Sequence, residues 1–547
     1  MRIRMTIALC AFILLLSGCV VAQIPGDDDQ QPKPLTTVEA ELFPLSSECT
    51  GCHNDIYAEN GAHYSYVEDW FNSVHGQSAL DPVFMAMVRH ETELLPEASD
   101  AIQEICASCH LPMADMAAIA LGISRSFLEN AANPSHELNP LYREGDSCMI
   151  CHQFSIDATE GSVVFRDTDL YVNLHQVPLG QTRNLYGYHK STESAQQSMR
   201  MALGYSTLAS NFERSNLICS VCHNLYTDAY TVDGQPTGKQ LPEQTVTQEW
   251  LASGRSGQSC QSCHMPVIVD PGPLSNRTIE EAAQGRIGLH NFVGANTYLF
   301  ELNGGRNNAL EKGLTATTEF LQSETATLLL TGSIASSSDS GALLTLDVMI
   351  DSLVAHKFPS GFPSRRAWLH VQVIDESGAL LYESGGYNNE GMILDNDGDL
   401  IPGAFEPHYA VIDQPGQVQI YESVMLDSNG RATTNLLQGI VYCKDNRLLP
   451  IGIIKDRLQN DIAVFGDALY DDDFVGGRDI THYLINLPAG SGNLTIKVEL
   501  LYQSVGYRFL EELLSHPSPE QQVLADLVKE HPNLPALVVS EEIKVSR

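Results

Sequence analysis

Basic residues and long hydrophobic runs are both scarce in this chain of 547 residues. It contains 31 lysines and arginines against 68 aspartates and glutamates, which gives a formal net charge of -37 at pH 7. Because so acidic a surface offers no positive field to displace counterions from phosphate, a nucleic-acid partner is excluded. A charged protein partner is expected to present a basic face. Beyond the N-terminus, no apolar segment reaches the roughly 20 residues that cross a bilayer.

The N-terminus has the features of a lipoprotein export signal. Two arginines precede an apolar stretch that is too short to span a membrane and that ends in Leu16-Ser17-Gly18-Cys19. This ending resembles the site recognised by lipoprotein signal peptidase, so we expect a signal peptide over 1–18, lipidation of Cys19 and a solvated tether over 19–45. Val20 favours sorting to the outer membrane, facing the periplasm or the cell surface. The alternative is an ordinary cleaved signal with a coincidental cysteine.

Ten of the thirteen cysteines fall into one spacing that occurs five times, Cys-x-x-Cys-His. This is the attachment site of c-type haem, in which two thiols about one helical turn apart add to the vinyl groups and the adjacent histidine becomes the proximal iron ligand. Zinc knuckles and redox pairs also use Cys-x-x-Cys, but they do not require the histidine that follows every copy here. The chain is therefore predicted to bind five haem c groups. The motif residues are Cys49, Cys52 and His53; Cys106, Cys109 and His110; Cys148, Cys151 and His152; Cys219, Cys222 and His223; and Cys260, Cys263 and His264.

The hydrophobic pattern predicts an α+β multidomain fold. Residues 46–312 hold all five motifs, and we expect a mostly helical and irregular multihaem cytochrome c domain whose haems form much of the core. Residues 320–505 show the alternation of apolar and polar residues that is typical of strands, which predicts an antiparallel β-sandwich. Residues 506–547 are expected to add helices and a strand. The individual elements expected are helices over 81–94, 191–203, 508–514 and 519–530, and strands over 327–333, 343–350, 368–373, 494–500 and 536–543.

Each low-spin haem needs a second axial ligand, and eighteen histidines minus five proximal ones leave thirteen for five positions. His75 follows an aromatic segment, His290 comes shortly after the fifth motif, His356 opens a turn at the domain junction, and His189 lies in the long gap between the third and fourth motifs. These four are the candidate distal ligands, with surface or structural roles as the alternative. A methionine ligand would raise the reduction potential. Weaker candidates are His175, His136, His63, His90, Met199 and Met201.

An acidic segment places carboxylates at positions one, three, five and twelve, namely at Asp395, Asp397, Asp399 and Glu406. That spacing suits a calcium ion wrapped by oxygen ligands. The glycine usual at position six is replaced by Leu400, and no flanking helices are predicted. Calcium is therefore one interpretation, and an acidic hairpin turn is the other.

Several segments along the mature chain carry a family resemblance. They are 70–84, Cys106 to Pro112, Gly145 to His152, Ser215 to Tyr226, Glu243-Gln244, Glu249-Trp250, Ser259 to Pro266, His290 to Phe292, His356 to Gly361, Arg365 to Trp368, and Lys444 to Pro450.

Through these segments the chain resembles a family of secreted multihaem c-type cytochromes with a C-terminal β-sandwich. The resemblance implies electron transfer, proximal ligation by the five motif histidines, and haems with two histidine ligands or with one histidine and one methionine. The family often has methionine where His75 stands, which implies that this position is a distal ligand of variable identity.

Three functions are compatible with these features. The first is electron transfer along the haems between a quinol-linked or periplasmic cytochrome donor and a terminal acceptor. The second is reduction or oxidation of a small inorganic nitrogen or sulfur compound at a haem with an open axial position. Such enzymes often alter one motif, and none is altered here. The third is a structural role, for example in a cytochrome filament.

Overall fold

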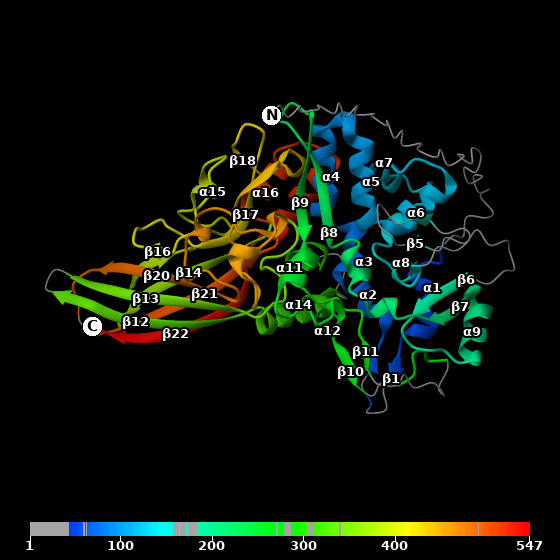
Figure 1. The fold of residues 1–547 in the computed structure, drawn as a ribbon, viewed down its shortest axis with the longest axis horizontal. Helices are drawn as coiled ribbons and strands as arrows, with labels where there is room; N and C mark the ends of the chain where they lie inside the picture. Colours follow the sequence, from blue (N-terminus) through cyan, green and yellow to red (C-terminus); the bar gives the residue numbers. More distant parts are fainter. Residues whose placement is uncertain are drawn as a thin grey trace, which may run out of the picture.

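The computed structural model describes residues 43–57, 61, 63–136, 138–156, 163–164, 171–172, 183–269, 272–277, 286–304, 310–338, 341–490 and 492–547. The predicted signal peptide, Cys19, nearly all of the tether and His175 lie outside these residues. Helices and short hairpins predominate up to residue 324, and two large sheets follow (Figure 1), so the fold class is α+β as predicted. Within the described ranges, no helix has both the length and the hydrophobicity to cross a membrane.

Helices α4 (Pro82–Leu94), α5 (Ser99–His110) and α6 (Pro112–Leu121) form the helical end of the molecule (Figure 1). The Asp81 side chain caps α4 by accepting hydrogen bonds from the first free amides, and proline at the first position fixes the starting φ angle. This confirms the helix expected over 81–94. The other helices up to residue 324 are α1 (Ser46–His53), α2 (Tyr66–Phe71), α3 (Val74–Gln77), α7 (Phe127–Ala132), α8 (Cys148–Cys151), α9 (Glu193–Leu203), α10 (Leu217–Ser220), α11 (Val246–Ala252), α12 (Cys260–His264), α13 (Thr297–Gly304) and α14 (Glu311–Glu324).

The motif-bearing part contains more strand than the sequence predicted. Its longest hairpin joins β8 (Asn224–Tyr230) to β9 (Pro236–Thr245), with two irregularities in the register. Strands β6 (Arg183–Gly187) and β7 (Tyr205–Ala209) pair in parallel and flank α9. The remaining short strands are β1 (Ile56–Tyr57), β2 (His63–Tyr64), β3 (Phe154–Ser155), β4 (Val163–Val164), β5 (Tyr171–Val172), β10 (Val267–Val269) and β11 (Arg286–Gly288).

Two sheets dominate the regular structure after residue 325. One sheet has the strand order β12-β13-β20-β16, and the other has the order β18-β17-β14-β21-β22, with β15 paired to β14 and β19 paired to β17. All of these pairs are antiparallel except β16 with β20, so the sheets are not purely antiparallel as expected. The strands are β12 (Ala326–Ser338), β13 (Gly341–Ser352), β14 (Arg366–Asp375), β15 (Leu380–Ser384), β16 (Val411–Ile412), β17 (Ile420–Leu426), β18 (Ala432–Thr433), β19 (Val441–Asp445), β20 (Arg478–Leu487), β21 (Asn493–Gln503) and β22 (Ala536–Ser546).

The two sheets share one hydrophobic core. In β21 the alternate residues Leu494, Ile496 and Val498 are buried, as the period-two pattern predicted, and they join Leu346 and Val348 of β13 in one cluster. Burying each such side chain stabilises the fold by about 1.5–3 kcal/mol. The core therefore lies between the sheets, away from the motif-bearing helices.

The C-terminal helices α16 (Tyr507–Leu514) and α17 (Pro519–Glu530) lie against α4 and so connect the end of the chain to the helical part. Glu520 of α17 accepts two hydrogen bonds from the Arg89 guanidinium of α4, at 3.0 and 3.1 Å. Gln521 donates to the carbonyl of Ala86 at 3.1 Å. Both helices match the expected ranges to within a residue.

Candidate haem-binding site

Each of the five Cys-x-x-Cys-His motifs forms or begins in a helical turn. The first two motifs end α1 and α5, the third forms α8 with its histidine just beyond, and the fifth forms the whole of α12. The fourth begins in α10, where the His223 amide donates to the Cys219 carbonyl at 3.0 Å. Because residues three apart share one face of a helix, this conformation places the two thiols of a motif on the same side. All ten motif cysteines carry free thiols, so none is used in a disulfide.

A single large cavity of about 1770 Å³ receives all five motifs. Its walls include both cysteines and the histidine of every motif, together with many apolar side chains. The four histidines predicted as distal ligands also border it. Free thiols, imidazoles and an apolar cavity together are the donor set and environment that covalently bound haem requires, so the residues present fit this cofactor.

Three motif histidines each face a candidate distal histidine. The ring centroids are 6.0 Å apart for His223 and His75 and 6.2 Å apart for His152 and His290. They are 6.1 Å apart for His264 and His356. Two imidazole nitrogens at about 2.0 Å from one metal ion lie about 4 Å apart, which places the ring centroids about 6 Å apart. These spacings suit two axial ligands of one iron.

The third pair joins His264 of the fifth motif to His356, with ring planes only 13° apart. Nδ1 of His264 lies 2.7 Å from the Val293 carbonyl, and Nδ1 of His356 lies 3.0 Å from the Lys357 carbonyl. Hydrogen bonds from Nδ1 to a carbonyl leave Nε2 as the unprotonated nitrogen, which is the arrangement found in metal-binding histidines.

Burial keeps several of the paired histidines neutral. Loss of solvation lowers the pKa of His75 to about 4 and that of both His223 and His290 to about 3. A neutral imidazole is the form that binds a metal ion. In His75, Nδ1 is buried and has no hydrogen-bond partner in the described part of the chain.

The other two motif histidines face no imidazole among the described residues. The His110 ring stacks on Phe84, with 3.8 Å between the centroids and 4° between the planes. The His53 ring meets Tyr66 edge-on at 6.5 Å, and its Nδ1 lies 3.0 Å from the Leu274 carbonyl. The second ligand of these two haems therefore stays unassigned.

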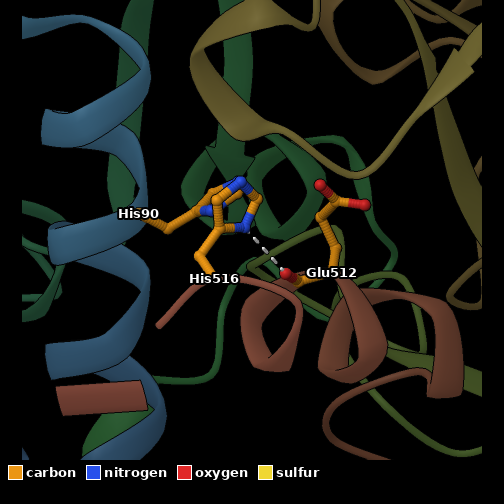
Figure 2. A group of neighbouring side chains, drawn as sticks. All are labelled: His90, Glu512 and His516. Carbon is orange, nitrogen blue, oxygen red and sulfur yellow. Dashed lines mark hydrogen bonds between the residues drawn. The ribbon is translucent and has the colours of Figure 1, made fainter. Parts of the chain in front are cut away.

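The remaining candidates occupy several different environments. His189 borders the cavity beside Tyr188, and no motif histidine is in ring contact with it in the described part of the chain. His90 lies beside His516 and Glu512 (Figure 2). The rest are His63, which is exposed and 3.1 Å from Asp55; His136, which contacts Tyr142; Met199, which borders the cavity; and Met201, which is 80% exposed.

Thiols of different motifs approach one another in two places. The Cys49 and Cys148 thiols of the first and third motifs are within hydrogen-bonding reach, and this contact together with burial raises the pKa of Cys49. The thiols of Cys219 and Cys260, from the fourth and fifth motifs, are placed in the same way. The motifs are therefore grouped in space as first with third and fourth with fifth, an order that their sequence positions do not give.

A buried network of four charges supports His356, and no local sequence pattern predicted it as a unit. Lys357 is 0% exposed, and its Nζ lies 2.7 Å from the Asp445 carboxylate. Arg447 contacts Asp445 at 2.8 Å and Glu249 at 3.0 Å, and Glu249 accepts a hydrogen bond from the Lys357 amide at 3.0 Å. All four lie in segments that carried the family resemblance, which was the only signal for them.

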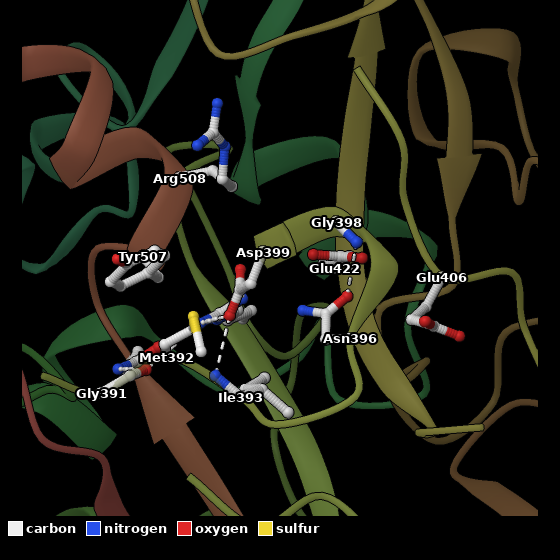
Figure 3. Close-up of polar contacts among 12 residues, drawn as sticks. Gly391, Met392, Ile393, Asn396, Gly398, Asp399, Glu406, Glu422, Tyr507 and Arg508 are labelled. Atoms are coloured by element: carbon white, nitrogen blue, oxygen red, sulfur yellow. Dashed lines mark hydrogen bonds and ion pairs between the residues drawn. The ribbon is translucent and has the colours of Figure 1, made fainter. Parts of the chain in front are cut away.

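Two of the four carboxylates that were candidate calcium ligands make other contacts within the protein. The Asp399 carboxylate binds the guanidinium of Arg366 through both oxygens, at 2.7 and 2.9 Å. Glu406 lies on the other side of the loop from Asp399 (Figure 3) and accepts from the amide of Asp397 at 2.9 Å. Among the described residues, no three of these carboxylates come close enough to share one ion. The segment is an acidic turn around α15 (Asp397–Leu400), and Asp395 is exposed in it.

The fold is similar to a known multihaem protein. A penta-heme cytochrome c552 from Thermochromatium tepidum, known from its crystal structure, matches with a TM-score of 0.50 and 16% sequence identity. The match covers 92% of this chain and 99% of that chain. At this identity the likeness shows a shared fold. No protein-family model and no curated protein matches the chain.

Proposed function

We propose that the chain is a multihaem c-type cytochrome that binds five haems covalently and moves electrons along them. The observation that carries this proposal is the convergence of all five Cys-x-x-Cys-His motifs on one cavity. The fold shared with a penta-heme cytochrome supports it. Bound haem supplies one-electron transfer at its iron, and its potential depends on the axial ligands and their surroundings.

The chain's own residues would fix the haems and set their environment. The ten motif cysteines hold the porphyrins, and the motif histidines provide one axial ligand each. His75, His290 and His356 provide the second ligand for the fourth, third and fifth motifs, as their ring spacings indicate. The apolar wall of the cavity excludes water, which limits solvent reorganisation when an iron changes charge.

The fifth motif offers a place where electrons enter or leave. Helix α12 contains no buried residue, and Cys263 is exposed, whereas Ala107 and Ser108 of the second motif and Met149 of the third are buried. A redox partner therefore reaches the fifth haem more directly than the second or the third. The net charge of -37 favours a partner with a basic face.

The cellular context belongs to the same proposal. The lipoprotein signal supports attachment to the outer membrane through Cys19, on the periplasmic or the outer side. The donor would be a quinol-linked enzyme or a periplasmic cytochrome, in a respiratory or extracellular electron-transfer chain.

Counting haems tests the proposal. The mature protein is expected to carry five haems by mass spectrometry and to show Soret absorption. The double variant Cys260→Ser/Cys263→Ser is expected to carry four, because both thioether bonds to one haem are lost. Cys443→Ser is the matched control and should keep all five, because this half-buried thiol lies outside the motifs. A mature wild-type protein without covalent haem would overturn the proposal.

A second candidate is catalysis at the first or the second haem, and one observation favours it. His53 and His110 face no imidazole in the part of the chain that the structure describes. An iron there with an open position would bind a small inorganic nitrogen or sulfur compound. Electron paramagnetic resonance of the oxidised protein decides between the candidates, because an open position gives a high-spin signal and a pure electron carrier gives low-spin signals only. Reduction of nitrite or sulfite by the high-spin form would establish the enzyme.

A further inference from the structure

Two histidines and one glutamate from distant parts of the chain meet outside the haem motifs. His90 comes from α4, Glu512 from α16, and His516 from the turn that follows α16 (Figure 2). One nitrogen of each histidine and one carboxylate oxygen all lie within 4.8 Å of one another. The two imidazole rings meet edge to face, with centroids 4.6 Å apart. His90 and Glu512 also border the haem cavity, but none of the three belongs to a motif or to the three facing pairs of histidines.

His90 is held in the tautomer that a metal ion requires. Its Nε2 lies 3.0 Å from Oδ1 of Asn435, and the amide group of Asn435 also donates to Gln438 at 3.2 Å, which fixes its orientation. An amide oxygen only accepts, so Nε2 carries the hydrogen and Nδ1 keeps its lone pair. His90 is 2% exposed, and Nδ1 has no hydrogen-bond partner among the residues described. Such a buried acceptor without a donor is costly unless it binds something.

The other two groups are free to complete a coordination shell. The Glu512 carboxylate has no hydrogen-bond or ion-pair partner within the described ranges. Nδ1 of His516 lies 2.9 Å from Oγ of Ser515 and 3.4 Å from the Glu512 carbonyl. Both contacts are made by Nδ1, so Nε2 of His516 is available to bind a metal ion.

The electrostatic environment favours a cation. Glu93 of α4 acts electrostatically on His90, and Glu512 acts on both His90 and Glu91. The protein as a whole is strongly acidic. Burial lowers the pKa of His90, so this imidazole is neutral at pH 7. The site therefore combines neutral nitrogen donors with surrounding negative charge.

We infer that His90, His516 and Glu512 form a binding site for a divalent first-row transition-metal ion, with zinc as its natural probe. Two imidazoles and one carboxylate are a donor set that zinc uses, with a fourth position left for water. Asn435 is a positioning residue, because it orients His90 without touching the ion. The ion would join α4 to the end of α16 and so hold the C-terminal segment against the helical part. This site goes beyond the proposed electron transfer and does not depend on it.

Zinc binding to the full, haem-loaded chain tests the inference. The wild-type protein is expected to bind one tight equivalent of Zn²⁺ by titration calorimetry, and anomalous scattering at the zinc edge should place the ion between the three side chains. His516→Ala and Glu512→Gln are each expected to weaken this binding at least tenfold, roughly the lower bound for disturbing a metal site. Asn435→Ala is expected to weaken it by about 10–100-fold.

His531→Ala is the matched control, because His531 also follows a C-terminal helix but lies outside the cluster. It should bind zinc as the wild type does. Unchanged Soret spectra in all variants show that they fold and carry haem. Absence of a tight equivalent in the wild type, an anomalous peak elsewhere, or undiminished binding by both His516→Ala and Glu512→Gln would each overturn the inference. Haem content is measured separately, so failure of the haem proposal would be distinguishable.

Discussion

Replacing Asp445 by asparagine is expected to lower the free energy of unfolding by about 3–5 kcal/mol, because it removes the charge that Lys357 and Arg447 share in the protein interior. Lys357 is 0% exposed, and burial lowers its pKa. With Asp445 neutral, two buried cations would face only Glu249. The loss of stability is measured as a lower midpoint concentration of guanidinium chloride when unfolding is followed by circular dichroism.

The same network predicts that the free energy of unfolding falls when the pH is lowered into the acidic range. Burial alone would raise the pKa of Asp445, but the neighbouring Arg447 and Lys357 outweigh it and lower the pKa to about 2. In the unfolded chain an aspartate titrates near pH 3.9. The stabilisation by Asp445 is therefore complete above about pH 4 and is lost as the pH falls towards 2. The Asp445→Asn variant should lack this acid-dependent component.

A surface pair provides the matched control for this prediction. Asp351 contacts Arg478 at 2.6 Å, but both side chains are open to solvent, being 39% and 46% exposed. Asp351→Asn should leave the unfolding midpoint unchanged, because solvent and salt screen such pairs. Equal midpoints for Asp445→Asn and wild type would show that the buried network contributes nothing to stability.

Local patterns were enough to predict most regular elements. The bounds of α17 are set by Ser518, whose side chain caps the first turn, and by Pro519 in its first position. The alternating strand β21 was equally clear, because one face is buried and the other is not. The hairpin of β8 and β9 was missed, because its residues show no regular alternation and its register is interrupted twice. The conformation of such a segment is determined by the residues packed against it rather than by its own hydrophobic pattern.

The candidate site likewise has one part that the sequence predicts, the haem attachment residues, and one part that it does not, the pairing of the histidines. The motifs fix which residues attach haem, because attachment needs only five consecutive residues. The facing pairs are different, because His75 lies between the first two motifs in sequence and yet faces His223 of the fourth. His290 follows the fifth motif and faces His152 of the third. These pairings depend on contacts between residues far apart in the chain, which no local pattern encodes. The acidic segment shows the same limit of local patterns, since the spacing of its carboxylates does not reveal that Asp399 binds a distant arginine.

The pairing of His290 with His152 leads to the last prediction. In the variant His290→Met, one haem of the five is expected to shift its reduction potential upward by on the order of 100 mV, within the roughly 0.8 V range that axial ligands span. The reason is that a thioether stabilises the ferrous iron more than an imidazole does. Methionine is an unbranched side chain that adapts to a buried position, so the fold should be retained.

A potentiometric titration followed at the Soret band measures this shift. His63→Met is the matched control, because His63 is exposed and contacts Asp55 and Tyr57 rather than a motif histidine, and its titration should overlay that of the wild type. An unshifted titration of His290→Met would show that His290 is not an iron ligand, whatever its spacing from His152. A shift confined to one of the five haems would establish that the ligands of a motif come from segments more than a hundred residues away, and hence that folding of the chain, rather than the motifs alone, sets the potentials along the electron path.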